Sequence, residues 1–203
     1  MDKVPNHELS KLPATLDQCR RCGLWEHATQ AVPGVGPSRA RIMLVGEQPG
    51  DQEDLQGLPF VGPAGALLDK ALAEAGVDRA GIYLTNAVKH FKWELRGKRR
   101  LHKTPAQKEI AACHLWLEDE LARIRPDVVV ALGGTALKSV LQNGGATMKS
   151  FMGAPFQHEG RWVVVVYHPS FALRARDEAS RRQAYQVIVD GLRQALRLLD
   201  KVR

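Results

Sequence analysis

Four short apolar runs, separated by segments of helical periodicity, constrain the fold of this chain more than any other feature. The runs cover residues 41–45, 82–86, 127–132 and 162–167. They do not alternate apolar with polar residues, which is typical of strands buried on both faces. Strands that alternate with helices favour a parallel sheet. We therefore predict an α/β fold of three layers (αβα) around a four-stranded, mostly parallel central sheet.

Helical periodicity predicts helices over 64–75, 105–123, 135–141 and 178–199. We interpret the segment from Gly144 to His158 as a loop and a weak hairpin. The 203 residues suit one domain with a full core, and neither a repeat nor a clear linker divides them. We predict a single domain over 1–203, with an N-terminal Cys-x-x-Cys segment and an inserted basic loop at about 91–104.

The charge of the chain favours a polyanionic partner. Its formal net charge is +7 and its isoelectric point is near 9.5. No apolar run approaches the length of a bilayer crossing, and the segment 1–11 is polar. We expect a monomer in the cytoplasm that does not contact membranes.

Polar residues follow three of the predicted strands. Gly46–Asp51 follows the first strand, Asn86 ends the second and His168 follows the fourth. The carboxyl ends of parallel strands meet at one edge of a sheet, where α/β folds bind ligands. The first segment lacks the glycine patterns of nucleotide-binding loops, so we do not expect a nucleotide cofactor. The sequence predicts a site at this edge.

Four residues, Glu47, Phe60, Asn86 and His168, each have a structural and a chemical interpretation. Glu47 either belongs to a turn or orients a base or water and accepts a proton. Asn86 is either a turn residue or a reader of a base edge, since its amide offers both a donor and an acceptor. Phe60 is either core or a stacking face for a base, and His168 is either a turn residue or a catalytic imidazole.

The segment Gly97–Lys103 concentrates positive charge around one histidine. Lys98, Arg99, Arg100 and Lys103 surround His102 within seven residues. Such density attracts phosphates and would place an imidazole beside a nucleic-acid backbone. The alternative is a solvated surface loop.

Three cysteines, Cys19, Cys22 and Cys113, do not form an even disulfide set. In a chain expected in the cytoplasm, a close Cys-x-x-Cys pair points to metal, cluster or redox chemistry. The pair precedes the first strand instead of starting a helix in a βαβ unit. This position favours ligation over a redox dithiol.

Four motifs, in this order, resemble those of the uracil-DNA glycosylase superfamily. They are Gly46-Glu47-Gln48-Pro49-Gly50, Pro59-Phe60-Val61-Gly62-Pro63-Ala64-Gly65, Thr85-Asn86-Ala87-Val88-Lys89 and His168-Pro169-Ser170. The resemblance extends from Cys19 to about Arg174 and is closest to the iron–sulfur branch, family four. Within that branch, Gln48 and the run 98–102 resemble the X-type enzymes. Those carry this basic loop and become covalently attached to uracil-containing DNA through its histidine.

The resemblance implies roles for the residues at the predicted edge. Phe60 would stack on an extruded uracil, Asn86 would hydrogen-bond its polar edge, and His168 would stabilise charge on the departing base. The turn Gly46–Gly50 would pack against uracil and deoxyribose. Asp51, with Gly50, is our candidate for the wall that excludes the methyl group of thymine. The remaining implied DNA contacts are Ser170, Arg174 in the segment 171–174 that fills the vacated gap, and the cations Lys98, Arg99, Arg100 and Lys103.

The resemblance also implies a metal site. Family four has four cysteine ligands. In this chain Cys19, Cys22 and Cys113 match three of them, and His90 stands at the position of the fourth. The X-type relatives share this change. Imidazole can ligate iron, so we predict a structural [4Fe–4S] cluster on Cys19, Cys22, His90 and Cys113. Zinc on the same four residues, or a three-cysteine site with His90 unligated, are the alternatives.

Two fates of the DNA follow from these roles. In a hydrolytic enzyme Gln48 could orient water, although a carboxamide cannot deprotonate it. Alternatively, neutral His102 attacks C1′, Glu47 takes its proton and Arg100 holds the loop closed. We predict excision of uracil, from single- or double-stranded DNA, followed by capture at His102 in a single turnover. A conventional multi-turnover glycosylase and a non-enzymatic nucleic-acid binding module are the competing hypotheses.

Overall fold

The computed structural model describes residues 12–202, so the polar segment 1–11 and Arg203 lie outside the described residues. Its main sheet has five strands in the order β2-β1-β5-β7-β6. The strands are β1 (Ile42–Gly46), β2 (Tyr83–Asn86), β5 (Val128–Leu132), β6 (Phe156–His158) and β7 (Arg161–Val166). The four predicted strands are present and run parallel to one another, whereas β6 runs antiparallel to β7.

The prediction of four strands is therefore wrong by one. Strand β6 has only three residues and lies at the edge of the sheet, so its apolar pattern is too short to predict a strand. A two-residue turn at Glu159 and Gly160, with φ of 48° and 78°, joins it to β7. Two consecutive left-handed residues form the turn whose twist suits an antiparallel pair.

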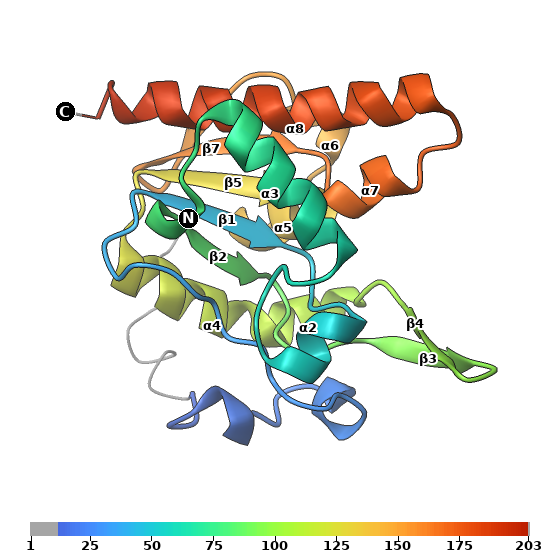
Figure 1. Ribbon diagram of the computed structural model, residues 1–203. Helices are drawn as coiled ribbons and strands as arrows, with labels where there is room; N and C mark the ends of the chain where they lie inside the picture. Colours follow the sequence, from blue (N-terminus) through green and yellow to red (C-terminus); the bar gives the residue numbers. More distant parts are fainter. Residues whose placement is uncertain (1–11, 203) are drawn as a thin grey trace.

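Helices cover both faces of the sheet, which confirms the three layers (Figure 1). Helices α3 and α8 pack on one face, and α4 and α5 on the other. The helices are α2 (Asp51–Gln56), α3 (Pro63–Ala75), α4 (Gln107–Ile124), α5 (Gly134–Val140), α6 (Met148–Phe151), α7 (Pro169–Leu173) and α8 (Glu178–Leu199). Short 3₁₀ turns lie at η1 (Leu16–Gln18), η2 (Gly23–Glu26) and η3 (Arg79–Gly81).

Strand β1 shows why the predicted strands are apolar at every position. Ile42 and Leu44 pack into the core beneath α3 and α8, whereas Met43 and Val45 pack into the core against α4 and α5. Successive side chains point to opposite faces of a strand, so a strand covered on both faces needs apolar residues throughout.

The basic segment is a β-hairpin, not the loop that we expected. Strand β3 (Trp93–Arg96) pairs antiparallel with β4 (Arg99–His102), and Trp93 lies opposite His102. Gly97, with φ of 64°, starts the two-residue turn. The hairpin forms a separate two-stranded sheet beside α2 and below the main sheet (Figure 1). The charged residues of the hairpin hide the strand alternation in the sequence.

Within residues 12–202, no helix is long and apolar enough to cross a membrane.

Candidate active site

Segments that are far apart in the sequence meet at the carboxyl edge of the sheet. Gly46 and Asn86 are register neighbours on β1 and β2, and His168 follows β7. The rings of Phe60 and His168 are stacked, with centroids 6.2 Å apart. The structure thus brings together Gly46, Phe60, Asn86 and His168, as the strand order predicts.

Asn86 carries a buried acceptor without a partner. Its side chain is 3% exposed, and its Oδ1 accepts no hydrogen bond from any described residue. A Cβ on Gly46 would lie 2.3 Å from this oxygen and 2.7 Å from Cζ of Phe60, so only glycine fits between them. Leaving a buried acceptor unsatisfied costs about 1–3 kcal/mol. The arrangement therefore marks the place where a ligand would supply a donor.

Phe60 adopts a left-handed backbone conformation, with φ of 57°. Nearby groups hold it there: the buried carboxylate of Glu53 accepts hydrogen bonds from the N–H groups of Gly50, Val61 and Gly62. A Cβ on Gly65 would lie 1.9 Å from the Phe60 carbonyl oxygen. Strained backbone persists only where its surroundings enforce it, and it clusters at ligand sites. Sequence reasoning missed Glu53, whose only signal is its place in the first turn of α2.

The hydrogen bonds of His168 fix the position of its proton. The Ser170 N–H donates to Nδ1 at 3.2 Å, and the Ser170 hydroxyl lies 2.8 Å from the same nitrogen. Nδ1 therefore acts as an acceptor, and the proton of the neutral ring is on Nε2. Desolvation, aided by His102 and Arg174, lowers the pKa of His168 to about 4. The ring is a neutral donor at neutral pH.

His102 lies beside a carboxylate that is itself held in place. Its Nε2 is 3.4 Å from Oε1 of Glu47, and the Thr135 hydroxyl donates to Oε2 of Glu47 at 2.6 Å. Desolvation, with a smaller effect from Arg174, lowers the pKa of His102, although Glu47 opposes the shift. His102 is therefore neutral at pH 7, with a proton acceptor at one nitrogen. Sequence reasoning missed Thr135, which follows β5 at the same sheet edge.

Gln48 has a different position from the one that we expected for a residue orienting water. Its side chain is buried, and its Nε2 donates to the carbonyl oxygens of Lys92 and Lys103, at 3.2 Å and 3.0 Å. Its Oε1 accepts from the Lys92 N–H at 3.1 Å. These two lysines flank the hairpin, so the Gln48 amide joins its two ends. Both ends of the amide are thereby engaged with the backbone.

Arg100 is held by the protein itself. Its guanidinium donates to Asp51 and to the fully buried Asp54, each at 2.6 Å, and lies 5.5 Å from the rings of Phe91 and Trp93. The geometry suits the expected closing of the segment better than a contact with phosphate. The other hairpin cations differ: Lys98 and Arg99 are exposed at its tip, and Lys103 pairs with Glu94 at 3.0 Å.

The cysteines are free, and Cys19 and Cys113 are buried whereas Cys22 is half-buried. Zinc binds thiolates at about 2.3 Å, which would bring the sulfur atoms within roughly 4 Å of one another. Within residues 12–202, no three His, Cys, Asp or Glu side chains form a group that could hold a single metal ion. The residues predicted to hold zinc or a cluster are therefore not gathered around one point in the described part of the chain.

The groups around Cys113 suit a thiolate that is bound to a metal cluster. Its Sγ accepts the Lys89 N–H at 3.3 Å, and the indole Nε1 of Trp116, which packs in the same apolar group, has no partner among the described residues. Desolvation raises the pKa of Cys113 to about 12, so a cation is needed to stabilise its thiolate. His90 is buried, and desolvation lowers its pKa, which keeps it neutral as a ligand must be. Three thiols and a neutral imidazole fit an iron–sulfur cluster.

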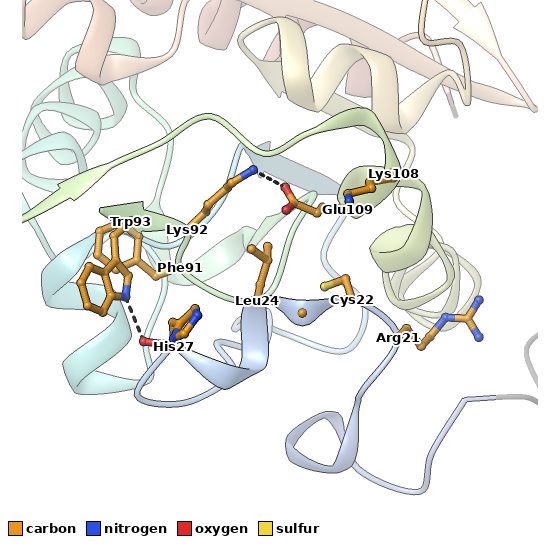
Figure 2. Close-up of a pocket in the computed structure, with 10 residues that line it drawn as sticks. Arg21, Cys22, Leu24, His27, Phe91, Lys92, Trp93, Lys108 and Glu109 are labelled. Carbon is orange, nitrogen blue, oxygen red and sulfur yellow. Dashed lines mark hydrogen bonds and ion pairs between the residues drawn. The ribbon is translucent and has the colours of Figure 1, made fainter. Parts of the chain in front are cut away.

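A separate hollow of about 470 Å³ lies between the Cys-x-x-Cys segment and the base of the hairpin (Figure 2). Figure 2 shows Cys22 and Leu24 on one side of it and Phe91 and Trp93 on the other. Lys92 and Glu109 form an ion pair of 2.8 Å in its wall. Neither Phe60, Asn86 nor His168 lines this hollow, so it is distinct from the site at the sheet edge.

The fold and the site define a parallel α/β protein whose sheet edge carries an aromatic face, an unsatisfied amide and a neutral imidazole donor. A family profile described as the uracil DNA glycosylase superfamily matches residues 33–193. The chain belongs to the uracil DNA glycosylase superfamily, which confirms the prediction.

Similar proteins support this placement. The type-4 uracil-DNA glycosylase of Thermotoga maritima is 35% identical over 185 residues, which cover 91% of each chain. That of Archaeoglobus fulgidus is 37% identical over 163 residues, covering 76% of this chain and 78% of its own. The type-5 enzyme of Pyrobaculum aerophilum is 34% identical over 173 residues, covering 77% and 73%. The type-4 relatives agree with the predicted branch.

Proposed function

We propose that this protein excises uracil from DNA and is then captured by the resulting sugar through His102. The observation that carries the excision step is the unpartnered Oδ1 of buried Asn86, which lies beside Gly46 and near Phe60. An imide N–H of uracil would satisfy that acceptor, and the ring of Phe60 would stack on the base. The names of the similar proteins, uracil-DNA glycosylases of types 4 and 5, support the same substrate.

Excision breaks the bond between N1 of uracil and C1′, and the electron pair leaves with the base. The Nε2–H of His168 donates to a carbonyl oxygen of the departing uracil, where negative charge accumulates. A neutral donor already in place stabilises this charge without reorganisation. Uracil then takes its proton from solvent, and the sugar is left electron-deficient at C1′.

Capture forms a bond between C1′ and His102. The nitrogen that faces Glu47 carries the proton, so the lone pair of the other nitrogen attacks C1′. The ring becomes positively charged and passes its proton to Glu47, whose position Thr135 fixes. The Gln48 amide and the pairing of Arg100 with Asp51 and Asp54 hold the hairpin over the site.

The rest of the chain contributes binding and support. Lys98 and Arg99, exposed at the hairpin tip, would contact phosphates of the uracil-containing strand, with Arg174 and Ser170 near His168. Cys19, Cys22, His90 and Cys113 would hold a [4Fe–4S] cluster, which supplies a structural cross-link between the N-terminal segment and α4. The reaction changes no oxidation state, so no step requires the redox chemistry of the cluster.

A denaturing gel tests both steps of the proposal. The purified protein is incubated with labelled single-stranded oligonucleotides containing uracil or, as a control, thymine, beside the His102→Ala variant. We expect a uracil-dependent band that survives heat and SDS and is absent with His102→Ala. Unattached DNA that breaks at the uracil position after alkali would indicate a hydrolytic enzyme. Intact, unattached DNA in every lane would favour a binding module.

A further inference from the structure

A buried ion pair lies next to the turn that carries Asn86. Lys89 is 0% exposed and Glu120 is 5% exposed, and Nζ of Lys89 lies 2.7 Å from Oε2 of Glu120. Burying two charges costs several kcal/mol per ion, and apolar residues of similar volume often serve stability as well or better. The pair therefore calls for an explanation other than stability.

The ammonium group of Lys89 uses all three of its N–H donors. Besides Glu120, it donates to the Thr85 hydroxyl at 2.6 Å and to the backbone carbonyl of Asn86 at 2.9 Å. An ammonium has three donors and no acceptor, so its hydrogen bonding is complete without solvent or ligand. One of the three bonds thus fixes the backbone of the residue that we assign to uracil recognition.

Glu120 anchors the ammonium from a different element. It lies on α4, and its second oxygen accepts the Gly34 N–H at 3.0 Å and faces the Tyr83 hydroxyl at 3.4 Å. Desolvation and Glu120 raise the pKa of Tyr83 to about 12, which keeps it a protonated donor. Groups from β2, α4 and the segment before β1 therefore hold the charge of Lys89 at one point.

The same turn supports other parts of the site. The N–H groups of Ala87 and Val88 donate to the carbonyl oxygens of Gly46 and Glu47, at 2.9 Å and 3.0 Å. The backbone N–H of Lys89 donates to Cys113 Sγ. A shift of this turn would move Asn86 together with the backbone of Glu47.

From this geometry we propose that Lys89 is a positioning residue for uracil recognition. Its buried ammonium, balanced by Glu120, holds the carbonyl of Asn86 so that the side-chain amide meets the base in one orientation. Lys89 is fully buried and touches no substrate, so it acts through Asn86. This inference rests on the proposed excision of uracil.

The test is a double-mutant cycle on the rate of uracil release. The change Lys89→Met combined with Glu120→Leu removes both charges, so that neither is left buried alone. Single-turnover release from a saturating uracil oligonucleotide should fall by about 10–100-fold, since a misplacement of about 1 Å can cost that much. The Kd for the DNA should change by less than about threefold, because phosphate contacts supply most of the affinity. In the Asn86→Ala background, the same pair of changes should reduce the remaining rate by less than about threefold.

Two further variants keep the inference testable. The milder Thr85→Val removes one partner of the ammonium at similar volume, and should slow release only when Asn86 is present. Leu192→Ala, a core truncation on α8, is the matched control for general destabilisation, and should lower Tm while leaving the rate unchanged. The role of Lys89 is overturned if the Lys89→Met and Glu120→Leu changes reduce the release rate by the same factor with and without Asn86, whether through unfolding, cluster loss or any other route. An unchanged release rate in that double variant also overturns it. Absence of release by the wild-type protein would instead contradict the proposed function.

Discussion

Replacing Gln48 by alanine is expected to separate uracil release from covalent capture. The Gln48 amide makes three hydrogen bonds to the backbone at the two ends of the hairpin, and His102 is the last residue of β4. The variant loses these bonds but keeps Asn86, Phe60 and His168 in place. The hairpin should therefore open more often while the base pocket stays intact.

The size of the effect follows from the number of bonds. A hydrogen bond contributes about 0.5–1.5 kcal/mol net, and water can replace part of it at the hairpin ends. Three bonds sum to about 1.5–4.5 kcal/mol, and replacement by water leaves the lower part of this range, about 1.5–3 kcal/mol. That corresponds to a roughly 10- to 100-fold loss of the closed state if each tenfold is about 1.4 kcal/mol. The ratio of covalent adduct to free abasic DNA should fall by a similar factor.

The assay quantifies adduct and alkali-cleaved product in the same denaturing gel, over time, for wild type, Gln48→Ala and the control Gln157→Ala. Gln157 is exposed on β6, so its replacement should leave the ratio unchanged. A Gln48→Ala protein that partitions like wild type would refute the role of Gln48 in holding the hairpin. Equal loss of uracil release and of adduct would also refute it.

Three other perturbations test the site. Gly46→Ala should reduce uracil release by more than about 100-fold while the protein stays folded by circular dichroism, because a Cβ there would lie 2.3 Å from Asn86 Oδ1; near-normal release would contradict the assigned pocket. The adduct rate should fall to half only below pH 6.5, since desolvation lowers the pKa of His102 from 6.5 and only the neutral ring has a free lone pair. In a rate–pH profile, half-loss at or above pH 6.5 would count against this. After iron removal, iodoacetamide should label Cys22 at least about tenfold faster than Cys113, as measured by peptide mass spectrometry. The reason is that Cys22 is half-buried, whereas Cys113 is buried and has a pKa of about 12. Similar labelling rates would contradict the assigned burial.

The predictable part of the fold depends on burial that follows a regular pattern along each element. The run from Ile42 to Val45 is apolar throughout because both faces of β1 are covered, and α8 matches its predicted bounds of 178–199. Strand β6 and the β3–β4 hairpin escaped prediction for the opposite reason. The hairpin residues are mostly exposed and charged, and β6 has only three, partly exposed residues, so neither shows the pattern that reveals a strand.

The same contrast holds for the site. Gly46, Asn86 and His168 could be placed together because the carboxyl ends of parallel strands share an edge. The partners of Gln48, Glu53, Arg100 and Lys89 could not be predicted, because each is set by a contact between separate elements.

The sequence by itself determined the layered α/β fold, the edge at which the site lies and the motifs that define the superfamily. These depend on local periodicity and on the order of the strands, which a linear sequence records directly. Only the tertiary structure decided that Gln48 binds the hairpin and that Glu47 lies between His102 and Thr135. Hydrogen bonds between distant residues depend on distances of a few tenths of an ångström, and packing of the whole chain sets those distances.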